Sequence, residues 1–182
     1  MSIPIFDENG VLPPGDYEVT FAQLRESILV NGIGEEGWDR EWRLKLVNSA
    51  EILVEQLWQV GITEVFLDGS FVEDKFHPND IDGYFVCDAT KFNELTRDLN
   101  ILNPYKVWTW DPSTRRAYAG FTKKQLPMWH HYRVELYPHF GQLAGIVDEH
   151  GHQQQFPAAF RKQRQTFVKK GIIQILKEGE TT

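Results

Sequence analysis

The chain has 182 residues and a mass of 21.2 kDa, a size that predicts one domain. With 41% apolar and 25% charged residues, the composition excludes a disordered or collagen-like chain, and the net charge of −7 disfavours non-specific binding of duplex DNA. Cys87 has no second cysteine to pair with, no apolar run approaches the roughly 18–20 residues of a membrane-spanning helix, and the first residues lack a signal-peptide pattern. We therefore expect a cytoplasmic protein with no membrane partner.

The first part of the chain predicts an arm followed by a short helix. Two prolines and a glycine at positions 13–15 favour an extended loop from Ile3 to Asp16. This loop belongs to an expected N-terminal arm of about residues 1–19 in a single domain 1–182. Thr20 is of the residue type that caps helices, and we expect a helix from there to about Val30.

Apolar periodicity then predicts a long helix and two strands. Apolar residues recur every three or four positions over residues 38–60, which is typical of a helix with one buried face, and Gly61 has the residue type that ends such a helix. The spacing of the apolar residues then changes. Residues 63–67 and 81–86 are short apolar runs that predict strands.

The second half predicts further elements of both kinds. In chain order these are a helix over 89–102, a strand over 106–110, a strand over 131–137, a hairpin of 143–147 and 153–156, a basic helix, and a strand over 172–176. The strand over 131–137 is predicted because its side chains alternate in character from one residue to the next. Together the elements predict an α/β (α+β) fold with a mixed β-sheet flanked by helices.

Two short motifs around the predicted strands carry the chemical information. Residues i and i+2 of a strand point to the same face, so Asp80 and Asp82 would present two carboxylates side by side. Two adjacent carboxylates repel unless a cation lies between them, and oxygen ligands with few other protein groups suit Mg²⁺. Gly69 and Ser70 follow a strand and offer backbone N–H groups and a hydroxyl, as a phosphate-binding turn does.

These residues resemble the signature of the nucleotidyltransferase superfamily with the DNA polymerase β-like fold. That signature is Gly-Ser, here Gly69-Ser70, then Asp-x-Asp, here Asp80-Ile81-Asp82, with a third acidic residue on a later strand. Glu135 is our candidate for the third acid, because it lies centrally in the later predicted strand. The wider string from Asp68 to Asp82, with the early Leu-Pro-Pro-Gly, is similar to small stand-alone bacterial members of toxin–antitoxin type.

The resemblance implies transfer of a nucleoside monophosphate from an NTP to an acceptor hydroxyl, with pyrophosphate leaving. Asp80, Asp82 and Glu135 would then be the catalytic and Mg²⁺-binding residues, and Gly69, Ser70 and Lys75 would bind the nucleotide. Lys169 and Lys170 are further candidates for phosphate contacts. The implied acceptor is RNA or protein, and an antitoxin or another protein is an implied partner.

Two other interpretations remain open on the sequence. One is a catalytically silent nucleotide- or protein-binding module of the same fold, and the other is an α/β domain that binds no nucleotide. Charge is unevenly distributed, since residues 1–90 carry a net −13 and residues 91–182 a net +6. That asymmetry suits a substrate that is both anionic and metal-bound, but it also arises on ordinary surfaces.

Overall fold

The computed structural model describes residues 3–179, which form a mixed α+β fold built on a five-stranded mixed sheet. The strands are β1 (Asp16–Val19), β2 (Val65–Asp68), β3 (Ile81–Val86), β4 (Val134–His139), β5 (Ile146–Val147), β6 (Gln153–Gln154) and β7 (Ile172–Ile175). The helices are α1 (Phe21–Glu26), α2 (Ile28–Asn31), α3 (Arg40–Gln59), α4 (Phe92–Leu102), α5 (Pro127–Tyr132) and α6 (Phe156–Ala159), with short 3₁₀ turns η1 (Gly69–Val72), η2 (Ala89–Lys91) and η3 (Pro112–Thr114).

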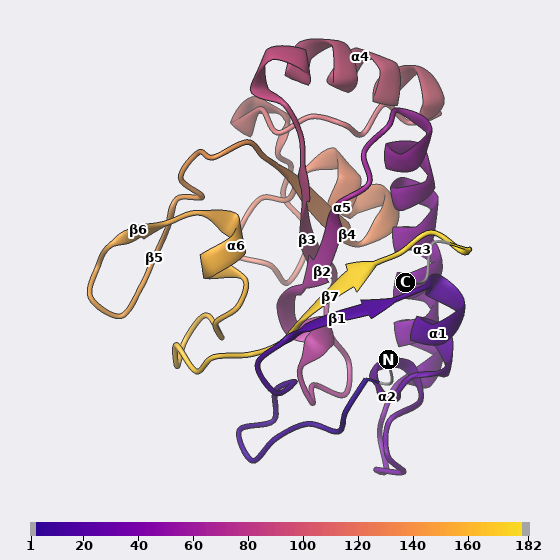
Figure 1. Cartoon of the computed structure of the whole chain (residues 1–182), viewed down its shortest axis with the longest axis vertical. Helices are drawn as coiled ribbons and strands as arrows, with labels where there is room; N and C mark the ends of the chain where they lie inside the picture. Colours follow the sequence, from indigo (N-terminus) through magenta and orange to yellow (C-terminus); the bar gives the residue numbers. More distant parts are fainter. Residues whose placement is uncertain (1–2, 180–182) are drawn as a thin grey trace.

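The main sheet has the strand order β1-β7-β2-β3-β4. The pairs β1–β7 and β3–β4 are parallel, whereas β7–β2 and β2–β3 are antiparallel. Strands β5 and β6 form a separate hairpin. In Figure 1 the sheet lies between α1 and α3 on one side and α6 with this hairpin on the other.

Each face of the sheet has its own apolar cluster. The larger core packs α3 and its neighbours against one face, and it includes the fully buried Leu53, Leu67 and Phe85. On the opposite face, a smaller cluster consists of Phe66, Tyr84, Phe156 and Ile172. Because side chains alternate along a strand, residues two positions from Phe66 or Tyr84 share this second face.

Several predicted elements are confirmed. Thr20 caps α1 with a reciprocal capping box, in which the side chains of Thr20 and Gln23 each accept a hydrogen bond from the other residue's backbone N–H. The helix expected as far as about Val30 is, however, interrupted at Ser27, which ends α1 and caps α2. The long helix α3 is followed by Gly61 with φ +86°, and the hairpin and the strands β2, β3 and β7 lie where the pattern places them. None of the helices among residues 3–179 has the length and apolar character needed to cross a membrane.

The expected N-terminal arm is partly wrong. Residues 16–19 form strand β1, which pairs with β7, and the preceding Val11 and Leu12 are fully buried. The backbone N–H of Leu12 donates to the carbonyl of Val72, beside the Gly-Ser turn. This segment is thus part of the core, and residues 1 and 2 of the expected arm lie outside the described residues.

The strand expected over 106–110 is wrong, because a side chain takes the place of a neighbouring strand. The Nδ2 of Asn100 donates to the carbonyl of Trp108 at 2.8 Å, and the N–H of Trp108 donates to Oδ1 of Asn100 at 3.0 Å. Both backbone groups of Trp108 are therefore satisfied without a ladder. The indole is fully buried and donates to Oε1 of Gln56 at 2.7 Å.

Two other expectations need correction. The strand expected over 131–137 begins only at Val134, because Pro127 starts helix α5, and Arg133 then ends it in the left-handed conformation with φ 55°. The expected basic helix is wrong, because the short helix α6 contains no basic residue and residues 160–170 are irregular, with Phe167 at φ 59°. The basic residues of this segment therefore do not share one helical face.

Candidate functional site

Three carboxylates lie in one row across neighbouring strands. Asp68 at the end of β2 pairs with Asp82 of β3, and Asp82 in turn pairs with Glu135 of β4. Paired residues point to the same face, so the row lies on the face opposite α3, in phase with Phe66 and Tyr84. Asp80, two residues before Asp82, shares this direction and adds a fourth carboxylate immediately before β3.

The Gly-Ser turn is packed directly against this row. Gly69 starts η1 with φ +79°, a conformation that favours glycine. A β-carbon at Gly69 would lie 2.7 Å from Oδ2 of Asp82, closer than real β-carbons approach, and 3.2 Å from the backbone N of Asp82, which is unusually tight. The turn and the carboxylate of Asp82 therefore meet only because residue 69 has no side chain.

Lys170 neutralises one end of the row. Its buried ammonium lies 3.2 Å from Oδ1 of Asp68 and 2.9 Å from Oε1 of Glu73, and it donates to the carbonyl of Gly69 at 3.1 Å. Burial lowers the pKa of Lys170, but attraction to Asp68 and Glu73 outweighs it, so the net pKa is raised. Lys170 is thus a structural counter-ion of the turn, and the sequence predicted only a phosphate contact for it.

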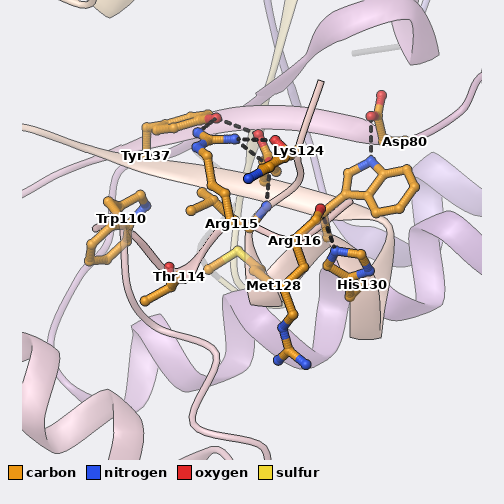
Figure 2. A network of polar contacts seen from close by, with 12 residues as sticks. Asp80, Trp110, Thr114, Arg115, Arg116, Lys124, Met128, His130 and Tyr137 are labelled. Carbon is orange, nitrogen blue, oxygen red and sulfur yellow. Dashed lines mark hydrogen bonds and ion pairs between the residues drawn. The ribbon is translucent and has the colours of Figure 1, made fainter. Parts of the chain in front are cut away.

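The other end of the row is held by hydrogen bonds (Figure 2). The indole Nε1 of Trp129 donates to Oδ2 of Asp80 at 2.7 Å. Glu135 accepts a hydrogen bond from the hydroxyl of Tyr137, and Nη1 of Arg115 lies 3.7 Å from its Oε1. Glu135 therefore already has an arginine and a tyrosine as partners.

Asp82 has no such partners. None of the described residues donates a hydrogen bond to its carboxylate, and its neighbours are Asp80, Glu135 and Asp68. Burial, and then repulsion from these three carboxylates, raises the pKa of Asp82 well above its ordinary value. The pKa of Asp80 is also raised by burial, although the bond from Trp129 opposes the shift.

The pKa of Asp68 is raised as well, although Asp68 has Lys170 as a partner. Burial raises its pKa to about 7, although the charge of Lys170 opposes the shift. Ionisation of these crowded carboxyl groups is therefore unfavourable without a cation, and a bound cation would relieve their mutual repulsion.

A buried arginine on α3 shapes the loop between the two motifs. The guanidinium of Arg43 is fully buried and donates to four carbonyls, those of Leu29 at 2.6 Å, Phe71 at 2.8 Å, Glu73 at 2.9 Å and Lys75 at 2.6 Å. Three of these carbonyls belong to alternate residues of the loop after Ser70. Burial lowers the pKa of Arg43 to about 9. The loop that connects Ser70 to Asp80 is thus fixed from inside the core.

The structure brings together most of the residues that the sequence singled out. Asp80, Asp82 and Glu135 are neighbours, and Gly69 contacts Asp82. Ser70 follows Gly69 in η1. Lys75 is exposed, and its charge lowers the pKa of Asp80, although burial raises that pKa overall.

Two observations bear on a metal ion. Within residues 3–179, no group of three or more His, Cys, Asp or Glu side chains is arranged to hold one. Asp80 and Asp82 nonetheless fit a single Mg²⁺, which in proteins often takes only one or two carboxylates and completes its shell with water and phosphate. Glu135 does not fit as a further ligand while Arg115 and Tyr137 hold it.

The sequence analysis assigned no catalytic or binding role to five residues of the site: Arg43, Asp68, Arg115, Trp129 and Tyr137. Tyr137 and Asp68 had a detectable signal, because each lies in a predicted strand or at its end, in phase with a chosen carboxylate. Arg43, Arg115 and Trp129 reach the site from other elements, and the sequence pattern contains nothing that pairs them with it.

Comparison with known proteins gives a family but no activity. No curated protein and no solved structure matches the chain. Residues 4–176 match DUF6932, which is described as a family of unknown function. Because this match spans nearly the whole chain, the protein belongs to the family of unknown function DUF6932.

Proposed function

We propose that the chain is a Mg²⁺-dependent nucleotidyltransferase with a polymerase β-like fold, which moves a nucleoside monophosphate from an NTP to an acceptor hydroxyl. The observation that carries the proposal is the row Asp68–Asp82–Glu135 across three adjacent strands, with Asp80 beside it and the Gly69 turn against Asp82. The order of Gly-Ser and Asp-x-Asp in the sequence supports the same conclusion.

Asp80 and Asp82 are the residues proposed to hold Mg²⁺. Asp82 has no hydrogen-bond donor among residues 3–179, and one oxygen of Asp80 is bound by Trp129 while the other has no partner there. A cation would relieve the repulsion among these carboxylates. When bound, Mg²⁺ supplies charge neutralisation for the triphosphate and for the pyrophosphate that leaves.

The remaining residues have roles that follow from their positions. Backbone N–H groups of the Gly69-Ser70 turn and the ammonium of Lys75 would bind phosphate oxygens. Glu135 would accept the proton of the acceptor hydroxyl as its oxygen bonds to the α-phosphorus and the bond to pyrophosphate breaks. Arg115, 3.7 Å from Glu135, would have to give up this contact for the carboxylate to accept a proton.

The acceptor and the partners rest on the resemblance alone. It implies RNA or protein as acceptor, and a toxin–antitoxin setting in which a partner protein controls the enzyme. The expected location is the cytoplasm.

Label transfer from each of the four α-labelled NTPs to bulk RNA and bulk protein tests the proposal. We expect Mg²⁺-dependent label with the wild type and at least a hundredfold less with Asp80→Asn plus Asp82→Asn. Asp88→Asn, an exposed aspartate outside the row, is the matched control and should retain transfer. Equal labelling by the wild type and the double variant would refute the assignment of these aspartates.

A silent nucleotide-binding module is the second candidate, and a specific observation favours it. Glu135 is held by Arg115 and Tyr137 and is not directed to a metal ion with Asp80 and Asp82. Under this alternative, NTP binding depends on both aspartates, but no label reaches any acceptor. Equilibrium dialysis of NTP with Mg²⁺, run beside the transfer assay, separates the two functions.

A further inference from the structure

A continuous part of the chain beside the carboxylate row is strongly basic. Residues 112–134 contain no Asp or Glu and contain five basic residues: Arg115, Arg116, Lys123, Lys124 and Arg133. The whole chain carries −7, so this segment departs sharply from its surroundings. It also contacts the row at two points, through Arg115 to Glu135 and through Trp129 to Asp80.

Most of these cations are not used to hold the fold together. Within the described chain, Arg116, Lys123, Lys124 and Arg133 have no carboxylate within 4.0 Å. The side chains of Arg116, Lys123 and Lys124 are exposed. In Figure 2 the guanidinium of Arg116 extends away from Asp80 and from the contacts of Arg115. The charges of Arg116, Lys123 and Lys124 therefore face solvent, on a segment that also contacts the carboxylate row.

Aromatic rings are interleaved with the cations. The guanidinium of Arg133 lies 3.9 Å from the ring centre of Trp129 and 4.5 Å from that of Tyr118. Tyr118 and Phe121 both pack edge-on against Trp129, at 5.1 and 5.0 Å between ring centres. Tyr118 is 43% exposed, so part of its ring is open to a ligand. An exposed ring beside a guanidinium is a surface on which a nucleic-acid base can stack.

Arg133 also lines a small pocket between this segment and helix α3. This pocket has a volume of about 250 Å³, and Arg133, Lys45, Ser49 and His130 are among its lining residues. No Asp or Glu lines it. Two cations, a hydroxyl and an imidazole around a small cavity suit a phosphate group.

We infer that residues 112–133, together with Lys45, form a binding surface for single-stranded nucleic acid that leads to the carboxylate row. Cations at intervals along an exposed segment match a chain of phosphates, and the partly open ring of Tyr118 matches an unpaired base. An acidic protein would use the cations but not the ring. A duplex would hide its bases from the ring. The inference deepens the proposed function, since it names single-stranded nucleic acid as the acceptor class.

Binding of an oligonucleotide without metal or nucleotide tests this surface separately from the chemistry. The probe is a fluorescein-labelled single-stranded RNA of mixed sequence and about 12 nucleotides, followed by fluorescence anisotropy in EDTA. The test variant combines Arg116→Glu, Lys123→Glu and Lys124→Glu. The control combines Lys91→Glu, Arg97→Glu and Lys177→Glu, which are also exposed and change the net charge by the same amount.

The test variant should bind at least about tenfold more weakly than the wild type. The slope of log K against log salt should also be shallower by about 2, because three phosphate contacts are lost. The control should lose less than about threefold, because screened charges far from the strand act weakly. Equal losses in both variants, or no binding by the wild type, would overturn the inference.

Two further measurements test whether a base stacks on Tyr118 and whether the partner is a single strand. Tyr118→Ala should weaken binding at least about fivefold and Tyr118→Phe should not, because only the ring is needed. A poly-glutamate peptide or a duplex of the same length that competes as well as the single strand would instead indicate an acidic protein or a duplex. Asp80→Asn plus Asp82→Asn should retain RNA binding, so a failure of transfer chemistry and a failure of this surface give different results.

Discussion

Gly69 and Asp82 are in contact across the turn that follows β2, with Oδ2 of Asp82 2.7 Å from where a β-carbon at Gly69 would be. The main chain of the turn therefore lies against the carboxylate that has no hydrogen-bond donor among residues 3–179. Gly69 has φ +79°, so a side chain there meets both backbone strain and a steric clash. These two effects can be separated by experiment.

Gly69→Ala should destabilise the fold by about 1 kcal/mol more than Gly61→Ala. Both glycines have positive φ, +79° and +86°, but a β-carbon at Gly61 would meet nothing within 4 Å. The difference therefore isolates the contact with Asp82. Urea unfolding measures the stability, and Mg²⁺-dependent NTP binding should be lost only in Gly69→Ala. Equal behaviour of the two variants would contradict the packing of Asp82 against this turn.

Arg43→Met should lower the free energy of unfolding by at least about 3 kcal/mol, because it leaves four carbonyls without a donor, two of them in fully buried hydrogen bonds. Arg43→Lys should recover part of the loss. Arg40→Met is the control, since Arg40 lies on the same helix but is exposed, and its side chain donates to Oδ1 of Asn31. It should change stability by no more than about 0.5 kcal/mol. Similar values for the two methionine variants would show that Arg43 does not fix the loop.

Arg115→Leu should raise the affinity of the nucleotide-free protein for Mn²⁺, measured by electron paramagnetic resonance titration. The change removes the cation next to Glu135 and leaves its carboxylate to be neutralised by a metal ion. Arg116→Leu removes the same charge from the neighbouring position, where no contact with Glu135 exists, and should leave the affinity within about twofold. An unchanged affinity in Arg115→Leu would exclude Glu135 from any metal site.

In EDTA, the stability of the wild type should fall between about pH 5 and 7. Asp82 has a raised pKa in the folded state, so the folded chain keeps a proton that the unfolded chain has released near pH 4. The folded state then binds more protons, and the free energy of unfolding decreases as pH rises.

Asp82→Asn should make this slope shallower by up to about 1.4 kcal/mol per pH unit. Asp88→Asn is the control, because the pKa of Asp88 is lowered and its carboxylate stays ionised throughout this range. Denaturant unfolding at pH 5, 6 and 7 gives the slopes. A wild-type slope equal to that of Asp82→Asn would contradict the crowding of carboxylates in the row.

The elements with a strong local signal were predictable from sequence, and those decided by distant contacts were not. The period of α3 and the apolar runs of β2 and β3 are local properties, and all three elements are confirmed. Residues 106–110 have the composition of a strand, but Asn100 satisfies the backbone of Trp108 and no ladder forms. A side chain from an earlier helix cannot be read from the apolar pattern of the segment it binds.

In the candidate site, too, local features were predictable from the sequence and distant contacts were not. Spacing predicts that Asp80 and Asp82 share a face, and the later strand with Glu135 is found, although it starts three residues later than expected. The partners of these carboxylates come from elsewhere, with Trp129 on α5 and Lys170 just before β7. Such partners depend on how the strands are ordered in the sheet, which the sequence pattern does not specify.

The placement of β7 between β1 and β2 has a consequence for the order in which the chain acquires its structure during synthesis. Until residue 175 has left the ribosome, β1 has no neighbour in the sheet and the β2 edge is open. Lys170, which neutralises Asp68, arrives with the same segment. Pairing that joins Asp16 to Ile172 also closes a very long loop, which slows folding. The sheet and the charge balance beneath its carboxylates are therefore completed together, as one late event.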